Sequence, residues 1–90
     1  MIVIPSREFN KSVEKIKDNV AKERLAKLVY NLENANNLNE ISNVVSLRNF
    51  QNLYRIRIGN YRLIVSHEKN TIEILLVEFL KRNENTYKFN

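Results

Sequence analysis

The chain has 90 residues, a formal net charge of +5 and 43% hydrophobic residues, so we expect one small domain over residues 1–90. It contains no cysteine, which excludes a disulfide framework, a thiolate metal site and a cysteine nucleophile. No apolar run approaches the roughly 20 residues of a membrane span, and Met1–Ser6 lacks the basic leader of a signal peptide. We therefore expect a cytoplasmic protein that has no contact with a membrane.

The positive charge is concentrated in the second half of the chain. Residues 6–40 carry seven basic and six acidic side chains, so that half is almost balanced. A pI of about 9.7 suggests a nucleic acid, an acidic protein or a membrane surface as partner and does not choose among them. The excess comes from Arg48, Arg55, Arg57, Arg62, Lys81, Arg82 and Lys88.

The first forty residues predict a short strand and two helices. Ile2–Ile4 is an apolar run ended by Pro5, and Ser6 suits a helix N-cap. Asp18 can interrupt the helical pattern and cap a second helix, which we expect to end near Glu33. Two apolar stripes at helical spacing are interpreted as core: Phe9, Val13, Ile16 and Val20, then Ala21, Leu25, Leu28, Val29 and Leu32.

The stretch Leu53–Ser66 predicts a β-hairpin. Residues alternate with period two on both sides of Gly59-Asn60, and glycine at the first central position suits a type II′ turn. With that loop, Arg57 lies opposite Arg62 on the neighbouring strand. One face then carries Tyr54, Ile56, Ile58, Tyr61, Leu63 and Val65, and the other carries Arg55, Arg57, Arg62, Ile64 and Ser66.

The remaining elements complete a predicted two-layer α+β fold. Ile41–Leu47 is compatible with a helical turn or a strand, and Thr71–Leu80 reads as a central strand buried on both faces. The order β-α-α-β-β-β predicts an antiparallel sheet with a helical hairpin on one face. The tyrosine-containing face of the hairpin should lie under the helices, which leaves the arginine face open.

Three arginines on one face of a hairpin are costly if their role is only structural, because like charges opposite each other destabilise a sheet. No aspartate or glutamate occurs between Asn43 and Ser66 to relieve that cost. The arginines can still be a solvated face, or pair with acids from elsewhere in the chain. Arginine is, however, suited to bidentate recognition of phosphate, so the functional alternative is that this face binds a polyanion.

The sequence offers few groups for other chemistry. Its one histidine, His67, is expected on the surface, and without clustered carboxylates we expect no metal and no cofactor. An enzyme built from Arg, Lys and Tyr can cleave RNA through the substrate's own 2′-OH, with cations stabilising the phosphorane transition state. Arginine is a poor base because it stays protonated, so a Lys or Tyr is needed to move protons.

Two segments resemble one known family. The run N-V-V-S-L-R-N-F-Q-N-L-Y-R-I-R-I-G-N-Y-R-L-I at Asn43–Ile64 is similar to the centre of the RelE/ParE toxin superfamily, and specifically to its ribonuclease branch. The tail F-L-K-R-N-E-N-T-Y-K-F at Phe79–Phe89 resembles that family's closing motif of aromatic-Leu-His-Arg followed by Tyr-Lys. The order of predicted elements agrees with a RelE-like fold over nearly the whole chain.

The resemblance implies roles for particular residues. Arg55 and Arg57 match the paired basic positions of the family's first hairpin strand, and Arg62 matches the basic residue after the turn. Arg82 and Tyr87 match the arginine and tyrosine of the closing motif, and Lys81 stands where many relatives have histidine. The first three arginines and Arg82 would bind the scissile phosphate, and either Lys81 or Tyr87 would supply acid–base catalysis. Arg48 would extend the basic surface to flanking RNA.

The implied function is that of a type II toxin that cleaves mRNA without a metal, often on the ribosome, and is neutralised by an antitoxin protein. Two alternatives remain. One is a ParE-like toxin that inhibits DNA gyrase by protein binding, which would not need the arginines in this geometry. The other is a noncatalytic RNA-binding module, which would place stacking aromatics on the binding face.

Overall fold

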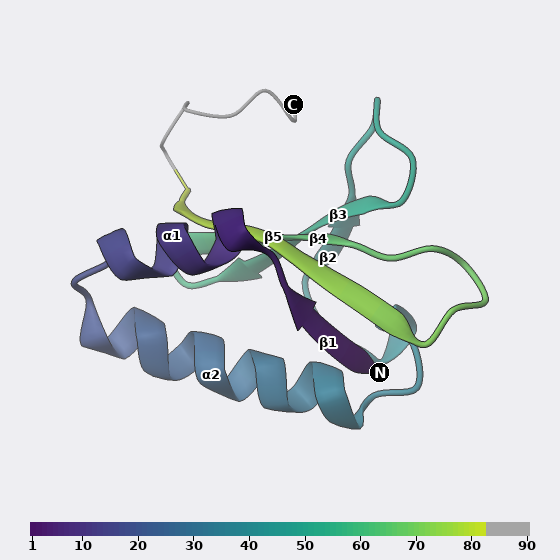
Figure 1. The fold of residues 1–90 in the computed structure, drawn as a ribbon, viewed down its shortest axis with the longest axis horizontal. Helices are drawn as coiled ribbons and strands as arrows, with labels where there is room; N and C mark the ends of the chain where they lie inside the picture. Colours follow the sequence, from purple (N-terminus) through teal and green to yellow (C-terminus); the bar gives the residue numbers. More distant parts are fainter. Residues whose placement is uncertain (83–90) are drawn as a thin grey trace.

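The computed structural model describes residues 1–82, which form two helices and a sheet (Figure 1). The expected strand, helical pair and hairpin are all present, and the fold class is confirmed as α+β. The elements in chain order are β1 (Ile2–Pro5), α1 (Arg7–Lys15), α2 (Asn19–Asn34), η1 (Leu38–Glu40), β2 (Val44–Ser46), β3 (Leu53–Ile58), β4 (Tyr61–Ser66) and β5 (Glu73–Lys81).

Within residues 1–82 the strands form one five-stranded sheet in the order β1-β5-β4-β3-β2. The expected antiparallel pairing holds from β2 to β5, but the sheet is mixed, because β1 pairs with β5 in parallel. The ambiguous segment Ile41–Leu47 supplies the fifth strand, β2, which covers part of the β3 edge. Local pattern could not decide either point, since both depend on which strands become neighbours.

Capping residues set the start of both helices as expected. The Ser6 side chain accepts a hydrogen bond from the Phe9 N–H, and the Asp18 side chain accepts one from the Ala21 N–H. Each bond satisfies an amide that has no partner inside its helix. The residues of the apolar stripes are buried or half-buried with one exception: Val20 is 56% exposed, because α1 ends at Lys15 and the chain bends before α2.

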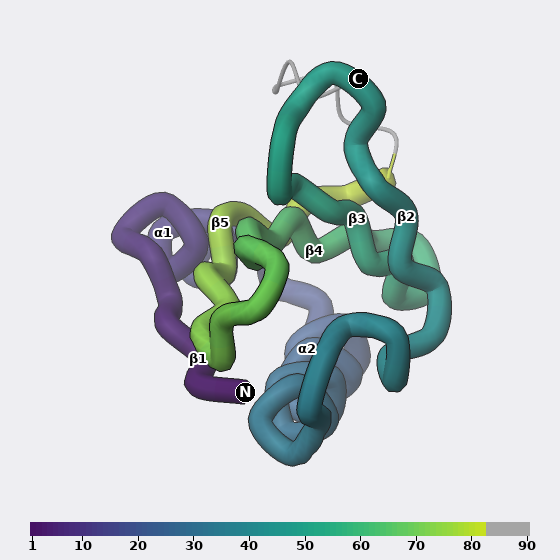
Figure 2. The backbone as a smooth tube through the Cα atoms, turned by 90° about the vertical axis from the view of Figure 1, so that its right-hand side faces the viewer, coloured from purple at the N-terminus to yellow at the C-terminus, as the bar shows by residue number. Residues whose placement is uncertain are grey.

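The core lies between the sheet and α2, with α1 beside it (Figure 2). Leu63 and Val65 are fully buried, and Tyr61 stacks on Phe79 with ring centroids 5.2 Å apart. These residues come from the hairpin face that the alternation assigns to the helices, so that assignment is confirmed. Leu25 and Leu32 of α2 meet this face in the same cluster.

Helix α1 packs along the outer edge of β5 and satisfies its backbone there. Strand β1 ends at Pro5, so the later part of β5 has no neighbouring strand on that side. The Ser12 hydroxyl accepts a hydrogen bond from the Phe79 N–H at 2.9 Å and donates one to the Phe9 carbonyl at 2.7 Å. The helix therefore replaces a missing strand, which also protects the edge from pairing with other chains.

Strand β5 lies between β1 and β4, whereas the central strand of the sheet is β4, and the expectation that β5 is buried on both faces is wrong. Ile74 and Leu76 are buried against the helical layer, whereas Leu75 is 38% exposed on the other face. The physical reason is that α2 covers one face of the sheet and no helix of residues 1–82 lies across the other (Figure 2).

Replacing Ser12 tests the contact between α1 and β5. Ser12→Ala should lower the free energy of unfolding by roughly 1–3 kcal/mol, because it leaves the buried Phe79 N–H without an acceptor. Chemical denaturation followed by circular dichroism measures the loss. Ser42→Ala, at an exposed position, is the matched control. Equal stabilities for the two variants would contradict the proposed role of the hydroxyl.

Candidate anion-binding site

The hairpin register brings the predicted arginines onto one face of the sheet. Arg57 pairs with Arg62 across β3 and β4, and Arg55 pairs with Ile64, as the alternation predicts. Gly59 has a φ of +55°, the left-handed conformation that the turn requires at its first central residue. Arg57 is exposed, while Arg55 and Arg62 are half-buried.

Arg82, which follows β5, joins the three hairpin arginines. Its backbone N–H donates to the Asn60 carbonyl at 2.7 Å, which ties the end of β5 to the hairpin turn. The Arg62 guanidinium donates a hydrogen bond to the Arg82 carbonyl. The arginines surround a cavity of about 90 Å³ that, among residues 1–82, is lined by Arg55, Arg57, Arg62 and Arg82.

No carboxylate is among the residues described as lining this cavity. Four cations around so small a space repel one another, and an anion placed between them would relieve that repulsion. The volume holds only a few water-sized groups, which suits a tetrahedral oxyanion better than a nucleobase. Planar guanidinium groups can each present two parallel donors to such an anion.

Lys81 lies next to the arginine cavity and not in it. It pairs with Tyr61 in the β4–β5 register, so its backbone position belongs to the helix-covered face. Its side chain is exposed at the end of β5 and lines a neighbouring cavity of about 480 Å³ together with Asn60, Arg62 and Arg82. Because the two cavities share Arg62 and Arg82, the cavity that Lys81 lines adjoins the arginine cavity. Tyr87 lies outside the described residues.

The arginine face is less open than the alternation predicts. Ile64 and Leu80 share this face and are 0% and 6% exposed. In both views the connection between β2 and β3, residues 47–52, rises on the side of the sheet opposite α2 (Figures 1 and 2). Arg48 is an exposed residue of this connection and does not line the four-arginine cavity.

The sequence reasoning missed Glu78. This half-buried residue pairs with Ile64, so its backbone position places it on the arginine face. It lines a separate cavity beside α1 that includes Lys11 and Lys15. The absence of acids from Asn43 to Ser66 therefore does not make the whole face free of acids. Period-two alternation in Thr71–Leu80 would have placed Glu78 with Ile74 and Leu76 on the helix-covered face, and it is the register shift between Ile64 and Val65 in the β4–β5 pairing that puts Glu78 on the arginine face.

The family model described as "ParE toxin of type II toxin-antitoxin system, parDE" matches residues 3–86 of this chain. The chain belongs to the RelE/ParE toxin superfamily. A curated relative, Toxin RelE3 of Methanocaldococcus jannaschii, is 29% identical over 73 residues, which cover 80% of this chain and 82% of the relative.

Solved RelE structures share the fold of this superfamily member. The RelB-RelE antitoxin–toxin complex of Methanococcus jannaschii gives a TM-score of 0.76 at 24% identity, covering 88% of this chain and 89% of the other. The archaeal RelE–RelB complex of Pyrococcus horikoshii OT3 gives 0.72 at 22% identity, covering 92% and 96%. The intact E. coli RelBE complex gives 0.68 at 18% identity, covering 92% and 98%.

His67 of this RelE/ParE chain is buried, so the expectation of a surface histidine is wrong. It is 9% exposed, and its Nδ1 lies 2.9 Å from the Glu73 carbonyl oxygen. The contact with Glu73 joins the end of β4 to the start of β5, which favours a structural role. Residues 1–82 contain no cluster of three His, Cys, Asp or Glu side chains able to hold a metal ion. No helix among them is long and apolar enough to cross a bilayer.

Removing one member of the Arg57–Arg62 pair tests the electrostatic strain in this toxin-family fold. Arg57→Gln should raise the free energy of unfolding by a few tenths of a kcal/mol, roughly the size of a cross-strand charge effect. Arg57 is preferable to Arg62 here, because the Arg62 side chain also bonds the Arg82 carbonyl.

Urea denaturation at low and high salt measures this effect. The gain should shrink at high salt, because salt screens exposed charges. Lys69→Gln, which removes the same charge from an exposed turn position outside the helices, should show no comparable gain. A destabilised Arg57→Gln variant at low salt would argue against repulsion between the two guanidinium groups.

Proposed function

We propose that this chain is an endoribonuclease toxin that cleaves mRNA without a metal ion, using the 2′-OH of the substrate as nucleophile. The observation that carries the proposal is the cavity formed by Arg55, Arg57, Arg62 and Arg82, with no carboxylate among its described lining residues. Membership of a toxin superfamily and a curated relative named Toxin RelE3 support it.

The four-arginine cavity suits the charge that develops in this reaction. Attack of the 2′-oxygen on phosphorus forms a phosphorane with added negative charge, and the bond from phosphorus to the 5′-oxygen then breaks. The proton of the 2′-OH goes to a base, and the leaving 5′-oxygen receives a proton from an acid. Cations held by a folded scaffold stabilise the transition state more than mobile ones, because they need no reorganisation as the charge appears.

Arg62 is the best placed of the four to stabilise the phosphorane. It sits between Arg57 in the hairpin register and Arg82, and the bond from its guanidinium to the Arg82 carbonyl limits its movement. Side chains held by neighbouring contacts keep the geometry that the reaction needs. Arg57, Arg55 and Arg82 then neutralise the phosphate and orient it.

Proton transfer falls to Lys81 or Tyr87 in this proposal. Lys81 lies beside Arg62 and Arg82 in the adjoining cavity, within the part of the chain that the structure describes. Tyr87 is kept as a candidate on its match to the family motif alone. Either side chain can act as donor or acceptor once its protonation state suits the step.

The structure argues against a noncatalytic module that binds RNA by base stacking on this sheet. Tyr61 is buried and stacked on Phe79, and Tyr54 is half-buried against the core, so neither presents a ring on the arginine face. Binding there would depend on phosphate contacts, which position RNA without reading its sequence.

The partners in this proposal are mRNA, the ribosome and a cognate antitoxin. Arg48, on the connection that rises beside the arginine face, would contact flanking RNA or ribosomal RNA through charge alone. The relatives solved as RelB–RelE complexes support an antitoxin partner. An acidic segment of that antitoxin would cover the arginine cavity.

Substitution of Arg62 tests the catalytic role. Arg62→Ala should lower the cleavage rate by about 10²–10³-fold, the usual effect of removing one group that stabilises a transition-state charge. The measurement is cleavage of a translated mRNA with added EDTA, with 5′ ends mapped. Arg7→Ala is the control for loss of an exposed positive charge elsewhere.

Lys81→Ala should reduce the rate with little change in RNA affinity and should alter the pH–rate profile, and Tyr87→Phe tests the hydroxyl alone. Wild-type cleavage rates in both Arg57→Ala and Arg62→Ala would exclude the arginine face as the active site. Growth arrest by a wild-type chain that cleaves no mRNA would instead favour inhibition of DNA gyrase.

An antitoxin should bind the free chain tightly, and its association rate should fall steeply as salt rises, because a cationic site attracts an acidic segment over distance. Stopped-flow association at several salt concentrations measures this for the product of an adjacent small gene. The association rates of the Arg57→Ala and Arg62→Ala variants should depend less on the salt concentration than that of the wild type. Absence of any binding by calorimetry would contradict the toxin–antitoxin role.

A further inference from the structure

A cavity of about 540 Å³ lies where three segments that are distant in the sequence meet. The first segment is residues 37–41, which include the short helix η1. The second is β2 with the start of β3, and the third is the turn that follows β4 and leads to β5. The described lining of this cavity shares no residue with that of the arginine cavity, so the proposed cleavage reaction does not account for it.

The floor of this cavity is the sheet face that is turned towards the helices. Ser46 pairs with Tyr54, and Tyr54 pairs with the fully buried Val65, so their side chains lie on the same face as the core. Arg55 and Arg57 alternate with Tyr54 along β3 and therefore belong to the other face. A ligand in this cavity would be bound on the opposite side of the sheet from the arginine cavity.

One part of the lining is apolar. Leu38 is buried, Ile41 and Val44 are half-buried, and the half-buried Tyr54 adds an aromatic ring from the floor. Small-molecule sites are typically cavities of roughly 300–1,000 Å³ with apolar and aromatic walls and a few polar groups that set the orientation of the ligand. The volume and the apolar lining both suit a flat heterocyclic ring.

The polar part of the lining has unused hydrogen-bonding capacity. Five of its side chains have no hydrogen-bond partner among residues 1–82, namely those of Asn39, Ser46, Tyr54, Lys69 and Asn70. Together they offer hydroxyl groups, amides that both donate and accept, and an ammonium group. A ligand can bond to these groups without breaking a hydrogen bond inside the described part of the protein.

His67 adds a positioned acceptor to the cavity. It is 9% exposed, and its backbone N–H donates to the Asn52 carbonyl at 2.9 Å. Its Nδ1 lies 2.9 Å from the Glu73 carbonyl oxygen, and because a carbonyl can only accept, Nδ1 carries the proton. In the neutral ring the other nitrogen, Nε2, is then an acceptor, which suits a hydroxyl or amino group of a ligand.

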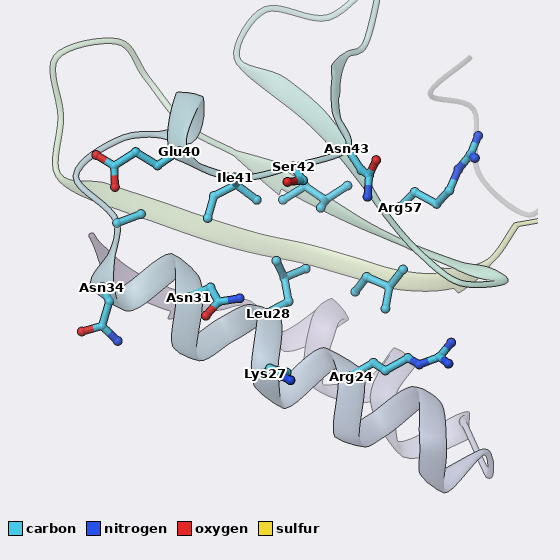
Figure 3. Close-up of a pocket in the computed structure, with 13 residues that line it drawn as sticks. Arg24, Lys27, Leu28, Asn31, Asn34, Glu40, Ile41, Ser42, Asn43 and Arg57 are labelled. Atoms are coloured by element: carbon cyan, nitrogen blue, oxygen red, sulfur yellow. The ribbon is translucent and has the colours of Figure 1, made fainter.

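The charge of the lining restricts the kind of ligand. Lys69 makes the cavity positive, and no carboxylate is among its described lining residues. Glu40, although it follows Asn39 in the chain, lines the separate groove beside α2 (Figure 3). A divalent cation would require carboxylate ligands, whereas an ammonium group attracts a phosphate. The cavity therefore favours an anionic ligand that also has a heterocyclic ring.

We propose that this cavity binds a nucleoside monophosphate, with its base between Tyr54 and residues 37–41 and its phosphate at Lys69. The asparagine amides present a donor beside an acceptor, the pattern by which asparagine pairs with the edge of adenine. The ribose hydroxyls, between base and phosphate, would donate to His67 Nε2 and bond the Ser46 hydroxyl. The proposal goes beyond the proposed toxin activity and does not depend on it.

The same ligand chemistry occurs in a free nucleotide and at the 5′-phosphorylated end of a nucleic-acid chain. The probes are AMP, adenosine, ribose 5-phosphate and a 5′-phosphorylated trideoxyadenylate, which lacks the 2′-OH that the proposed cleavage uses. NMR titration of the full chain follows the ring signals of Tyr54 and His67. AMP should shift both signals saturably, adenosine should do so more weakly, and ribose 5-phosphate should bind more weakly than AMP. Shifts with AMP support a free nucleotide as the source, and shifts with the trinucleotide alone support a chain end.

Substitutions at the two ends of the cavity test the proposed orientation. Lys69→Gln should weaken AMP about three- to fivefold, the loss of one exposed ion pair, and should leave adenosine binding unchanged. Asn39→Ala should weaken AMP and adenosine alike, because it removes a contact with the base. The control is Lys17→Gln, which removes the same charge from an exposed residue that lines no described cavity and should change neither affinity.

The arginine cavity can also attract the phosphate of AMP, so one further variant separates the two sites. Arg57→Gln removes a cation from the arginine cavity and should leave the AMP-induced shifts of Tyr54 and His67 unchanged. Loss of those shifts in this variant would assign AMP to the arginine cavity and overturn the proposal.

Three other results would also overturn the nucleotide site. These are no saturable shift of Tyr54 and His67 with AMP or the trinucleotide at millimolar concentration, equal AMP affinity of the Lys69→Gln and Lys17→Gln variants, or binding of ribose 5-phosphate as tight as that of AMP. Failure of the proposed function would appear separately, as a wild-type chain that cleaves no mRNA while this cavity still binds the nucleotide.

Discussion

Gly59 turns the chain between β3 and β4, and the register that it sets decides which side chains meet the helices and which meet the solvent. A shift of one residue would exchange the faces, placing Arg57 in the core and Ile56 outside. Ile56 and Leu63 prevent that shift, because they form a buried pair under α2 that would lose its burial. The hydrophobic core therefore holds Arg57 opposite Arg62 in spite of their repulsion, and the arginine cavity is a consequence of core packing on the reverse face.

The positive charge of the four arginines makes them repel one another and also makes them attract an anion. Arg55, Arg57, Arg62 and Arg82 enclose a small cavity whose described lining contains no acid, so an anion in the cavity would be attracted by four guanidinium groups. The fold supports this arrangement through backbone bonds, including those that join Arg82 to Asn60 and Arg62 to the Arg82 carbonyl. An anion bound there would therefore interact with side chains that these backbone contacts already position.

Strand β3 has two roles because its side chains alternate. Arg55 and Arg57 line the anion cavity, while Ile56 and Ile58 belong to the face of β3 that packs under the helices. The alternation along β3 thus gives one set of side chains to the core and the other set to the anion cavity.

Local pattern in the sequence determined the capped helices at Ser6 and Asp18, the hairpin at Gly59 and the common face of Arg55, Arg57 and Arg62, because each depends on residues close in the chain. Only the tertiary structure decided the parallel pairing of β1 with β5, the burial of His67 and Ile64, and the position of Glu78 on the arginine face. Those features depend on which distant strands become neighbours, as does the meeting of Arg82 with Arg62 twenty residues away. From the sequence, Arg82 was predicted as a site residue only because it matches the family's closing motif. The strand order β5-β4-β3 gives the physical reason, because the antiparallel pairing of β5 with β4 brings the end of β5 back to the hairpin turn.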